Sequence, residues 1–239
     1  MKGVFFDLGG TLFSYRNVAR TTVPLLLEAC ARLEVVAAPD AIKDAYTRAG
    51  REIALAYADR PYYLHRDLFH DTFMRFADLL GARHDEGVHA WYHDAHREAM
   101  IACLVLKDDC VETLARLHAR GLYLAVVSNI DDDMLEPLIG REGLDRYLHH
   151  WTSSETAQSC KPDRRFFELA LARSALRAPE VLFVGDSPEH DIAGAQALGM
   201  RTALIVDGGM EPPLQSRQVA TRPDHTVHRL GELLDLIEG

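Results

Sequence analysis

The sequence has 239 residues, of which 48% are hydrophobic and 26% are charged, proportions typical of a globular protein. This composition excludes a disordered chain, a collagen and a disulfide-rich scaffold. The 36 acidic and 26 basic residues give a formal net charge of -10, which is the wrong sign for a protein that neutralises a phosphate backbone. We therefore expect one or two domains and no binding to nucleic acid.

The four cysteines lie far apart and form no C-x-x-C pair: Cys30, Cys103, Cys110 and Cys160. Their spacing predicts reduced thiols rather than a zinc site or a redox dithiol. The chain reaches Asp7 before an apolar signal segment is complete, and no run approaches the ~18 apolar residues of a membrane-spanning helix. These features predict a cytoplasmic protein that does not bind membranes.

The first predicted element is a buried strand, Val4 to Phe6, which runs into the glycine loop from Asp7 to Thr11. From about residue 15 the apolar residues recur at helical spacing. One stripe consists of Val23, Leu26, Leu27 and Cys30, and a second consists of Phe69, Phe73, Phe76, Ala77 and Leu80, followed by a stop at Gly81. This stretch therefore predicts a helical insertion.

After about residue 107, predicted helices alternate with predicted strands. The helices include one with Val111, Leu114 and Leu117 that ends at Gly121, one with Pro162 in its first turn, one with Asp191 as its N-cap, and a closing helix at 230–237; the strands are 122–127, 181–184, 202–206 and 225–227. This alternation favours a parallel sheet. We predict an α/β fold, a Rossmann-like doubly wound parallel sheet core at 1–14 and 106–239, with an inserted all-helical cap domain at 15–105.

Three of the predicted strands end in a polar side chain, namely Asp7, Ser128 and Asp186. Such residues are common in turns, so each position alone says little. Ligands of open parallel sheets, however, bind beyond the carboxyl ends of the strands. The recurrence of polar residues at three such ends predicts a functional site there.

Four stretches in chain order resemble the motifs of the haloacid dehalogenase-like (HAD) hydrolases. They are Phe5-Phe6-Asp7-Leu8-Gly9-Gly10-Thr11-Leu12, Val126-Val127-Ser128-Asn129, Lys161-Pro162-Asp163, and Val184-Gly185-Asp186-Ser187 with Asp191. The resemblance covers essentially the whole chain, and the helical insertion resembles the C1 cap of the family. It implies a hydrolase of small phosphorylated metabolites that acts as a monomer or homodimer.

The resemblance also implies a role for each motif residue. Asp7 would be the nucleophile that forms an aspartyl-phosphate, since a carboxylate is already ionised at neutral pH. A Mg²⁺ ion would offset the charge repulsion, held by oxygens of Asp7, Gly9, Asp186 and Asp191. Lys161 would stabilise charge on the nucleophile and the phosphoryl oxygens. The phosphate would be bound by Ser128, Asn129, Gly10 and Thr11.

Gly9 departs from the family pattern, because the usual phosphatases carry an Asp two residues after the nucleophile. That Asp protonates the leaving oxygen and then activates water, and loss of such a group costs roughly 10²–10⁴ in rate. Its absence favours substrates with good leaving groups and counts against phosphomutase activity. Tyr15 and His65 are candidates for a replacement donor, although ordinary packing roles are the more common explanation.

Two other functions are compatible with Gly9. A 2-haloacid dehalogenase would use Asp7 without a metal, but the two further carboxylates Asp186 and Asp191 favour a metal-dependent phosphatase. The second alternative is a catalytically weak protein that binds a phosphorylated ligand. The retained Asp7, Ser128 and Lys161 count against pure binding.

Several other patterns favour ordinary structural roles. His89, His93 and His96 have spacings compatible with zinc, yet an exposed polar helix face explains them better. The run Asp131-Asp132-Asp133 predicts the first turn of a helix. The group Arg60, Tyr62, Tyr63 and Arg66 fits either a substrate pocket or a packed helix junction. Hinges for cap closure are predicted at 13–16 and 104–107.

Overall fold

The centre of the computed structural model, which describes residues 1–206 and 221–238, is a six-stranded sheet. Its strands lie in the order β5-β4-β1-β6-β7-β8, and all neighbours pair in parallel. The strands are β1 (Gly3–Phe6), β4 (Tyr123–Ser128), β5 (His150–Ser153), β6 (Val181–Gly185), β7 (Arg201–Ile205) and β8 (His225–Val227). Successive strands add to opposite sides of β1, which confirms the predicted doubly wound α/β fold.

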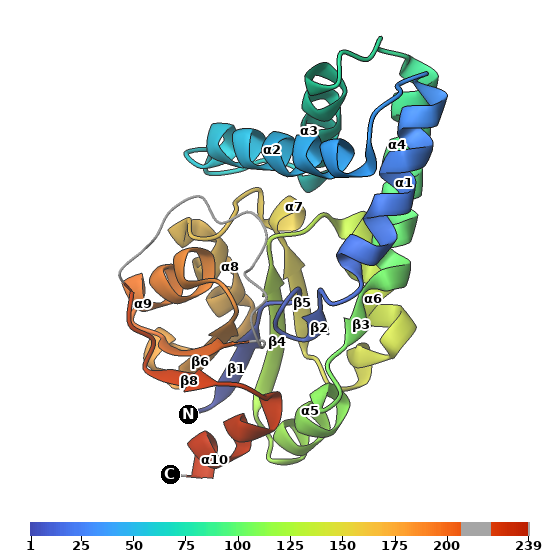
Figure 1. The fold of residues 1–239 in the computed structure, drawn as a ribbon. Helices are drawn as coiled ribbons and strands as arrows, with labels where there is room; N and C mark the ends of the chain where they lie inside the picture. The colour runs from blue at the N-terminus through green and yellow to red at the C-terminus, as the bar shows by residue number, and fades with distance from the viewer. Residues whose placement is uncertain (207–220, 239) are drawn as a thin grey trace.

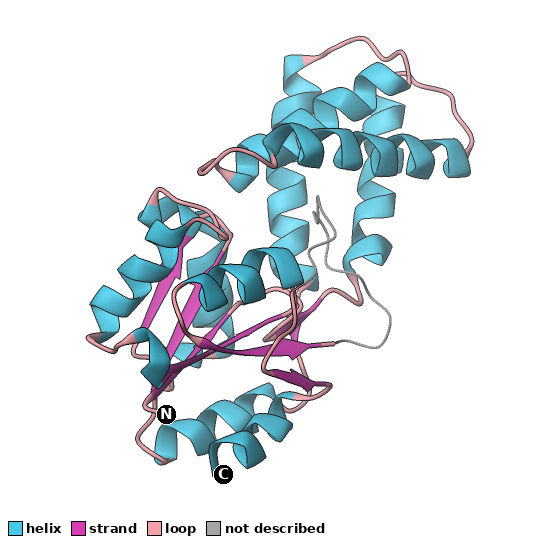
Figure 2. Ribbon diagram, turned by 90° about the vertical axis from the view of Figure 1, so that its left-hand side faces the viewer, coloured by secondary structure: helices cyan, strands magenta, loops and turns pink. Residues whose placement is uncertain are grey.

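Helices cover both faces of this sheet (Figures 1 and 2). They are α5 (Cys110–Ala119), α6 (Asp132–Glu142), α7 (Ser154–Ala157), α8 (Arg164–Ser174), α9 (Gly194–Ala197) and α10 (Leu233–Glu238), with short 3-10 helices at Leu144–Arg146, Ala178–Glu180 and Leu230–Glu232 and a π-helix at Pro188–Ala193. Because strand side chains alternate, Val4 and Phe6 pack toward α5, α6 and α10, whereas Phe5 packs toward α8 and α9. These two buried layers fix β1 at the centre of the molecule.

Four helices form a separate layer beyond the carboxyl ends of the strands (Figure 1). They are α1 (Val18–Arg32), α2 (Pro39–Tyr57), α3 (His65–Leu79) and α4 (Glu86–Cys103), and we call them the helical region. Their apolar faces share a core of their own, which includes Leu26, Phe73 and Phe76. Both connections to the rest of the chain, which we call the sheet region, run through a small antiparallel sheet formed by β2 (Phe13–Ser14) and β3 (Val105–Leu106).

Two predicted helix starts are wrong by a few residues. Pro162 precedes α8, because the carboxylate of Asp163 caps that helix by accepting a hydrogen bond from the backbone N–H of Arg165 at 2.8 Å. Asp191 lies inside the π-helix rather than at an N-cap, since the hydroxyl of Ser187 takes that position and accepts from His190 N at 3.1 Å. In both cases a neighbouring polar side chain provides the cap.

Apolar spacing alone also misjudged some surfaces and missed β5. Leu27 and Val111 belong to predicted apolar stripes but are 40% and 42% exposed. Strand β5 has no apolar run that would have predicted it.

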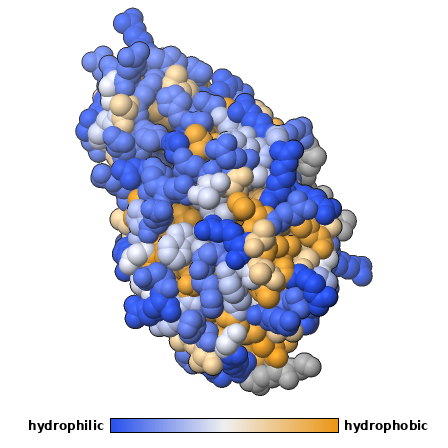
Figure 3. Space-filling model, turned by 180° about the vertical axis from the view of Figure 1, so that it is seen from behind, coloured by the Kyte–Doolittle hydropathy of each residue, from blue (hydrophilic) through white to orange (hydrophobic). Residues whose placement is uncertain are grey.

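The surface of the helical region is mostly hydrophilic on the face seen in Figure 3, and apolar residues gather over the sheet region. No helix in the described part of the chain has the length and apolar character that a membrane span requires.

Candidate active site

The carboxyl ends of the three central strands bring Asp7, Ser128 and Asp186 together. In the sheet, Phe6 is in register with Val126 on one side and Val184 on the other, so the residues that follow reach the same edge. The backbone N–H of Asp7 continues the ladder by donating to Val184 O at 2.9 Å. The three positions that the sequence pattern singled out therefore line one site.

The centre of the site is Lys161, whose ammonium group joins two carboxylates. Its Nζ donates to Asp7 Oδ1 at 2.6 Å and to Asp191 Oδ1 at 2.5 Å. All three side chains are buried, with Lys161 only 3% exposed. The hydroxyl of Ser128 also donates to Asp7 Oδ1, at 2.9 Å. Both bonds fall on the same oxygen, so within the described residues the Oδ2 atom of Asp7 is left for a ligand or a substrate.

Burial and nearby negative charge raise the pKa values of Asp7 and Asp186. Burial, opposed by Lys161, raises the pKa of Asp7. Burial and the charges of Asp7 and Asp191 raise the pKa of Asp186 well above its usual range. Burial alone would lower the pKa of Lys161, but Asp191 and Asp7 outweigh it and raise that pKa. The site therefore holds an excess of negative charge that one lysine does not neutralise.

Asn129 holds the backbone of Lys161 in place. Its Oδ1 accepts from Lys161 N at 2.7 Å, and its Nδ2 donates to Lys161 O at 3.0 Å. These two bonds join the loop after β4 to the loop before α8. They fix the backbone of Lys161, and so the point from which its side chain extends toward Asp7 and Asp191. Sequence reasoning placed Asn129 with the phosphate-binding groups and did not predict this positioning contact.

Asp7, Asp186 and Asp191 form a compact oxygen cluster. One carboxylate oxygen from each lies within 4.8 Å of the other two, and within the described residues this is the one group of three or more acidic, histidine or cysteine side chains close enough to hold a metal ion. Asp191 is oriented by the backbone N–H of Ser187, which donates to its Oδ2 at 3.0 Å. An all-oxygen donor set with excess negative charge suits Mg²⁺.

The glycine loop after Asp7 makes close approaches that larger residues would prevent. Gly10 has a φ of +75°, and a Cβ there would lie 2.5 Å from Cγ of Asp186. A Cβ on Gly9 would collide with the Tyr15 side chain, lying 2.8 Å from its Cζ and still closer to its hydroxyl oxygen. The side chain of Thr11 is fully buried behind this loop. Gly9 thus lacks the side chain that the family pattern has at this position, but the Tyr15 side chain occupies the space beside it.

Residues 1–199 match the family of haloacid dehalogenase-like hydrolases. The chain belongs to this family. The identification confirms the resemblance carried by the four motifs, and it makes the protein a haloacid dehalogenase-like hydrolase with phosphatases among its relatives.

Full-length relatives of this HAD hydrolase include both phosphatases and dehalogenases. The ribulose-1,5-bisphosphate 5-phosphatase of Halopiger xanaduensis is 30% identical over 244 residues, which cover 98% of each chain. The (S)-2-haloacid dehalogenase of Pseudomonas sp. strain YL is 26% identical over 247 residues, covering 100% of this chain and 95% of the other. The fold is similar to that of the putative HAD-hydrolase YfnB from Bacillus subtilis, with a TM-score of 0.77, 18% identity and coverage of 100% and 99%.

A recess in this HAD hydrolase leads from Lys161 toward the helical region. It is lined by Ala54, Tyr57, Ala58, Arg60, Tyr63, Leu68, Lys161, Pro162 and His190. The guanidinium carbon of Arg60 lies 3.7 Å from the centre of the Tyr57 ring. Arg60 and Tyr63, two residues for which the sequence left a pocket and a helix junction open, thus face the same recess as Lys161.

The helical region docks on the sheet region through Asp131. The Asp131 carboxylate, 1% exposed, accepts hydrogen bonds at 2.8 Å from the backbone N–H groups of His65 and Arg66, the first two residues of α3. Arg66 also pairs with Glu155 at 2.8 Å. As predicted, α6 begins at Asp132, but Asp131 caps a helix of the other region. Sequence spacing gave no signal for a contact 66 residues away.

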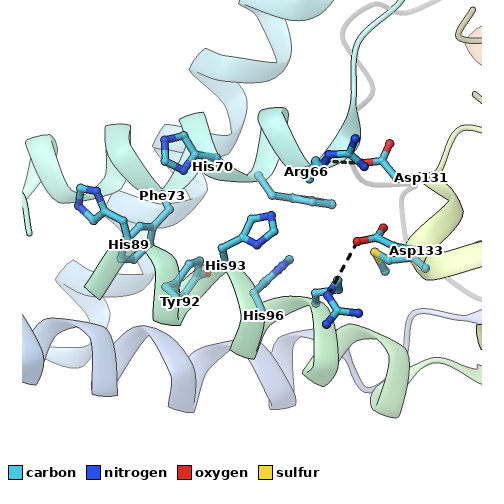
Figure 4. Close-up of a pocket in the computed structure, with 12 residues that line it drawn as sticks. Arg66, His70, Phe73, His89, Tyr92, His93, His96, Asp131 and Asp133 are labelled. Carbon is cyan, nitrogen blue, oxygen red and sulfur yellow. Dashed lines mark hydrogen bonds and ion pairs between the residues drawn. The ribbon is translucent and has the colours of Figure 1, made fainter. Parts of the chain in front are cut away.

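The histidines of α4 are part of an aromatic pocket in the helical region (Figure 4). The expectation of an exposed polar face is wrong for His89 and His96, which are 8% and 5% exposed. They pack against Phe73 and Tyr92, whose rings stack at 3.8 Å. Burial lowers the pKa of His96 to about 4 and that of His65 to about 3, so both are neutral at pH 7. The apolar faces of these rings explain why they belong inside.

Proposed function

We propose that this protein is a magnesium-dependent phosphatase of small phosphorylated metabolites and that Asp7 forms an aspartyl-phosphate during the reaction. The observation that carries the proposal is the cluster of Asp7, Asp186 and Asp191 around a single lysine. Two further carboxylates lie beside the nucleophile, buried Asp191 and partly buried Asp186, and their repulsion is costly unless a cation offsets it.

The residues around Asp7 fit nucleophilic attack on phosphorus. Lys161 and Ser128 both bond Oδ1 and hold the carboxylate in one orientation. An Asp7 oxygen attacks phosphorus, the bond from phosphorus to the ester oxygen breaks, and water later hydrolyses the aspartyl-phosphate. Lys161 and the Ser128 hydroxyl provide positive charge and a donor for the phosphoryl oxygens as negative charge shifts toward the leaving group.

Asp7, Asp186, Asp191 and the carbonyl of Gly9 would hold the magnesium ion. When bound, Mg²⁺ neutralises phosphate charge and so lets an anionic nucleophile approach an anionic substrate. Burial raises the pKa of Asp7 and of Asp186, and the charges of Asp7 and Asp191 raise the pKa of Asp186 further, so a divalent cation would stabilise the ionised carboxylates. Asn129 binds the backbone of Lys161 and so helps to hold the lysine between Asp7 and Asp191.

The recess beside Lys161 fits a small polar substrate. Arg60, Tyr63 and His190 line the opening next to Lys161 and carry polar groups that can bind a substrate. The hydroxyl of Tyr57, which also lines it, donates to Asp71 at 2.6 Å. The phosphatase relative named above acts on a sugar bisphosphate according to its name. We propose the same broad class here, a phosphorylated sugar or a similar polyhydroxy compound.

We also propose that residues 15–105 are a cap that closes over the site, with hinges at 13–16 and 104–107. The two connections pair as β2 and β3, so a rotation there would move α1–α4 together. The contacts of Asp131 and Glu155 with the start of α3 would hold the closed form. All four cysteines are free thiols, which fits a reducing compartment such as the cytoplasm.

The deciding experiment measures phosphate release from a panel that includes sugar phosphates and aryl phosphates, with Mg²⁺ or with a chelator. We expect turnover that requires Mg²⁺ and falls at least about 10³-fold in Asp7→Asn. Asp145→Asn, an exposed aspartate of the sheet region, is the matched control and keeps full activity.

A parallel assay follows halide release from 2-haloacids, because a full-length relative is a dehalogenase by name. Chelator-resistant halide release that is lost in Asp7→Asn would replace the phosphatase proposal with dehalogenation. Tight binding of phosphate esters without any turnover would instead support a ligand-binding protein.

A further inference from the structure

The side-chain position that Gly9 leaves vacant is filled by a hydroxyl group from elsewhere in the chain. Tyr15 lies in the connection between β2 and α1, and its ring folds back over the glycine loop. A Cβ built on Gly9 would lie 2.8 Å from Cζ and 3.1 Å from Cε1 of this ring, and closer still to the hydroxyl oxygen. Real Cβ atoms do not approach other atoms so closely, so Tyr15 and any larger residue at position 9 exclude each other.

This hydroxyl belongs to the catalytic centre by its surroundings. The ring also approaches Gly10, where a Cβ would lie 3.0 Å from Cε2 of Tyr15 and 2.5 Å from Cγ of Asp186. Tyr15 also packs against the apolar core of the sheet region, which restricts the ring. Asp186, Asp7 and Asp191 all act on the phenol electrostatically. The hydroxyl is therefore held at the edge of the acidic cluster, on the loop that follows the nucleophile.

The other donors of the site are already committed. Lys161 bonds Asp7 and Asp191, and the Ser128 hydroxyl bonds Asp7. Ionised carboxylates only accept hydrogen bonds. The hydroxyl of Tyr15 makes no hydrogen bond with another group in residues 1–206 and 221–238, and a phenol keeps its proton at neutral pH. The hydroxyl of Thr11, on the same loop, also lacks a hydrogen-bond partner within the described residues, but it is fully buried. Tyr15 is only partly buried, so its hydroxyl is the donor of the two that can meet a substrate oxygen.

We propose that Tyr15 is a catalytic residue whose hydroxyl donates a hydrogen bond to the ester oxygen of the substrate as the bond to phosphorus breaks. The inference rests on the proposed phosphatase function and adds the group that takes the place of an acid at position 9. The phenol keeps its proton: an Asp7 oxygen bonds to phosphorus, the leaving oxygen takes a proton from water, and the water that hydrolyses the aspartyl-phosphate returns one to the solvent.

A donor at the leaving oxygen matters most when that oxygen is a poor leaving group. The negative charge on an alkoxide that forms in the transition state is large, whereas an aryl oxide spreads its charge over the ring. Removal of the Tyr15 hydroxyl therefore slows alkyl phosphates more than aryl phosphates. A tyrosine that only fills space affects both substrates equally.

The test compares wild type with Tyr15→Phe, which keeps the ring and removes the hydroxyl, and with Tyr147→Phe as a control distant from the site. The measurement is kcat for a series of phosphate monoesters of increasing leaving-group pKa, with saturating Mg²⁺. We expect Tyr15→Phe to lower kcat by about 10- to 100-fold for alkyl esters and by less than about threefold for p-nitrophenyl phosphate. A steeper dependence of rate on leaving-group pKa is the decisive readout, because a purely structural role does not change it.

A second variant guards against an indirect effect of the first. Gly9→Ala places a methyl group where the hydroxyl lies, so it displaces the hydroxyl without altering the tyrosine. It should reproduce the steeper dependence, and the Gly9→Ala/Tyr15→Phe double variant should be no worse than either single one. An unchanged dependence in both single variants would overturn the inference, even if Asp7→Asn is inactive. Phosphatase activity that survives in Asp7→Asn would overturn the underlying function instead.

Discussion

The sheet region and the helical region both bury titratable side chains, but they do so by opposite means. Beside the sheet, Asp7, Lys161 and Asp191 hold one another through short hydrogen bonds between opposite charges. In the helical region, His89 and His96 lie among aromatic rings, where burial favours the neutral imidazole. The comparison shows that the surroundings of a side chain, more than its type, decide whether it carries charge or fills space.

The largest effect should follow from removing the only cation of the acidic cluster within the described residues. Lys161→Met leaves Asp7 and Asp191 buried without their shared partner, so we expect activity to fall at least about 10³-fold and the free energy of unfolding by about 3–5 kcal/mol. Phosphate release and urea unfolding, each with and without Mg²⁺, measure both effects. The loss of stability should be smaller with Mg²⁺, and Lys43→Met, at an exposed lysine, should leave both quantities unchanged. An equally stable Lys161→Met protein without Mg²⁺ would contradict this description.

The two regions should also respond to pH in opposite directions. Burial lowers the pKa of His96 from 6.5 to about 4, so the unfolded chain binds more protons between these values, and stability is lost as the pH falls through that range. Burial raises the pKa of Asp186, so its contribution is instead lost as the pH rises through the folded value. Mg²⁺ should suppress the second effect and leave the first.

A urea titration at about pH 7.5 and about pH 5.5 in Mg²⁺ isolates the histidine contribution. His96→Phe should reduce the loss of stability over this interval by about 1 kcal/mol, the value of nearly one proton over one pH unit. His228→Phe, at an exposed histidine, should keep the wild-type pH dependence. If the two variants show the same pH dependence, His96 is not held neutral by its surroundings.

Effects on stability smaller than that of Lys161→Met are expected where the two regions meet. Asp131→Ala removes the acceptor for two backbone N–H groups of α3 and should lower the free energy of unfolding by about 1–3 kcal/mol. Glu155→Gln weakens a partly exposed pair with Arg66, and the amide oxygen can still accept from the backbone N–H of Asp132, so the change should cost less than about 1 kcal/mol. Urea unfolding ranks the two, and small-angle scattering should show a more open average shape for Asp131→Ala. The reverse ranking would mean that charge pairing, rather than helix capping, holds the interface.

Local patterns in the sequence predicted most of the sheet region. Short apolar runs followed by Asp7, Ser128 and Asp186 identify the central strands and the site edge, and the structure brings these residues together. Strand β5 (His150–Ser153) was missed because a His-Trp-Thr-Ser segment has no apolar run. Its burial comes from pairing with β4, which is a tertiary effect.

Contacts between distant segments account for the remaining differences. The sequence named Tyr15 as a candidate donor, but the position of its ring beside Gly9 depends on a chain that folds back across six positions. The contact of Asp131 depends on a helix that begins 66 residues earlier in the chain. Neither contact leaves a periodic signal. Histidine spacing on α4 was visible, but whether its rings face water or Phe73 depends on how α3 packs, which local spacing does not record.

The capping of α3 by Asp131 limits how freely the two regions can be exchanged between proteins. The residue before α3 is Leu64, whose side chain offers no acceptor for the first N–H groups of the helix. The loop after β4 thus provides the N-terminal capping acceptor for a helix of the helical region. A chimaera that grafts residues 15–105 onto another sheet region needs a carboxylate at the position of Asp131, and evolution that replaces one region must preserve this junction in the other.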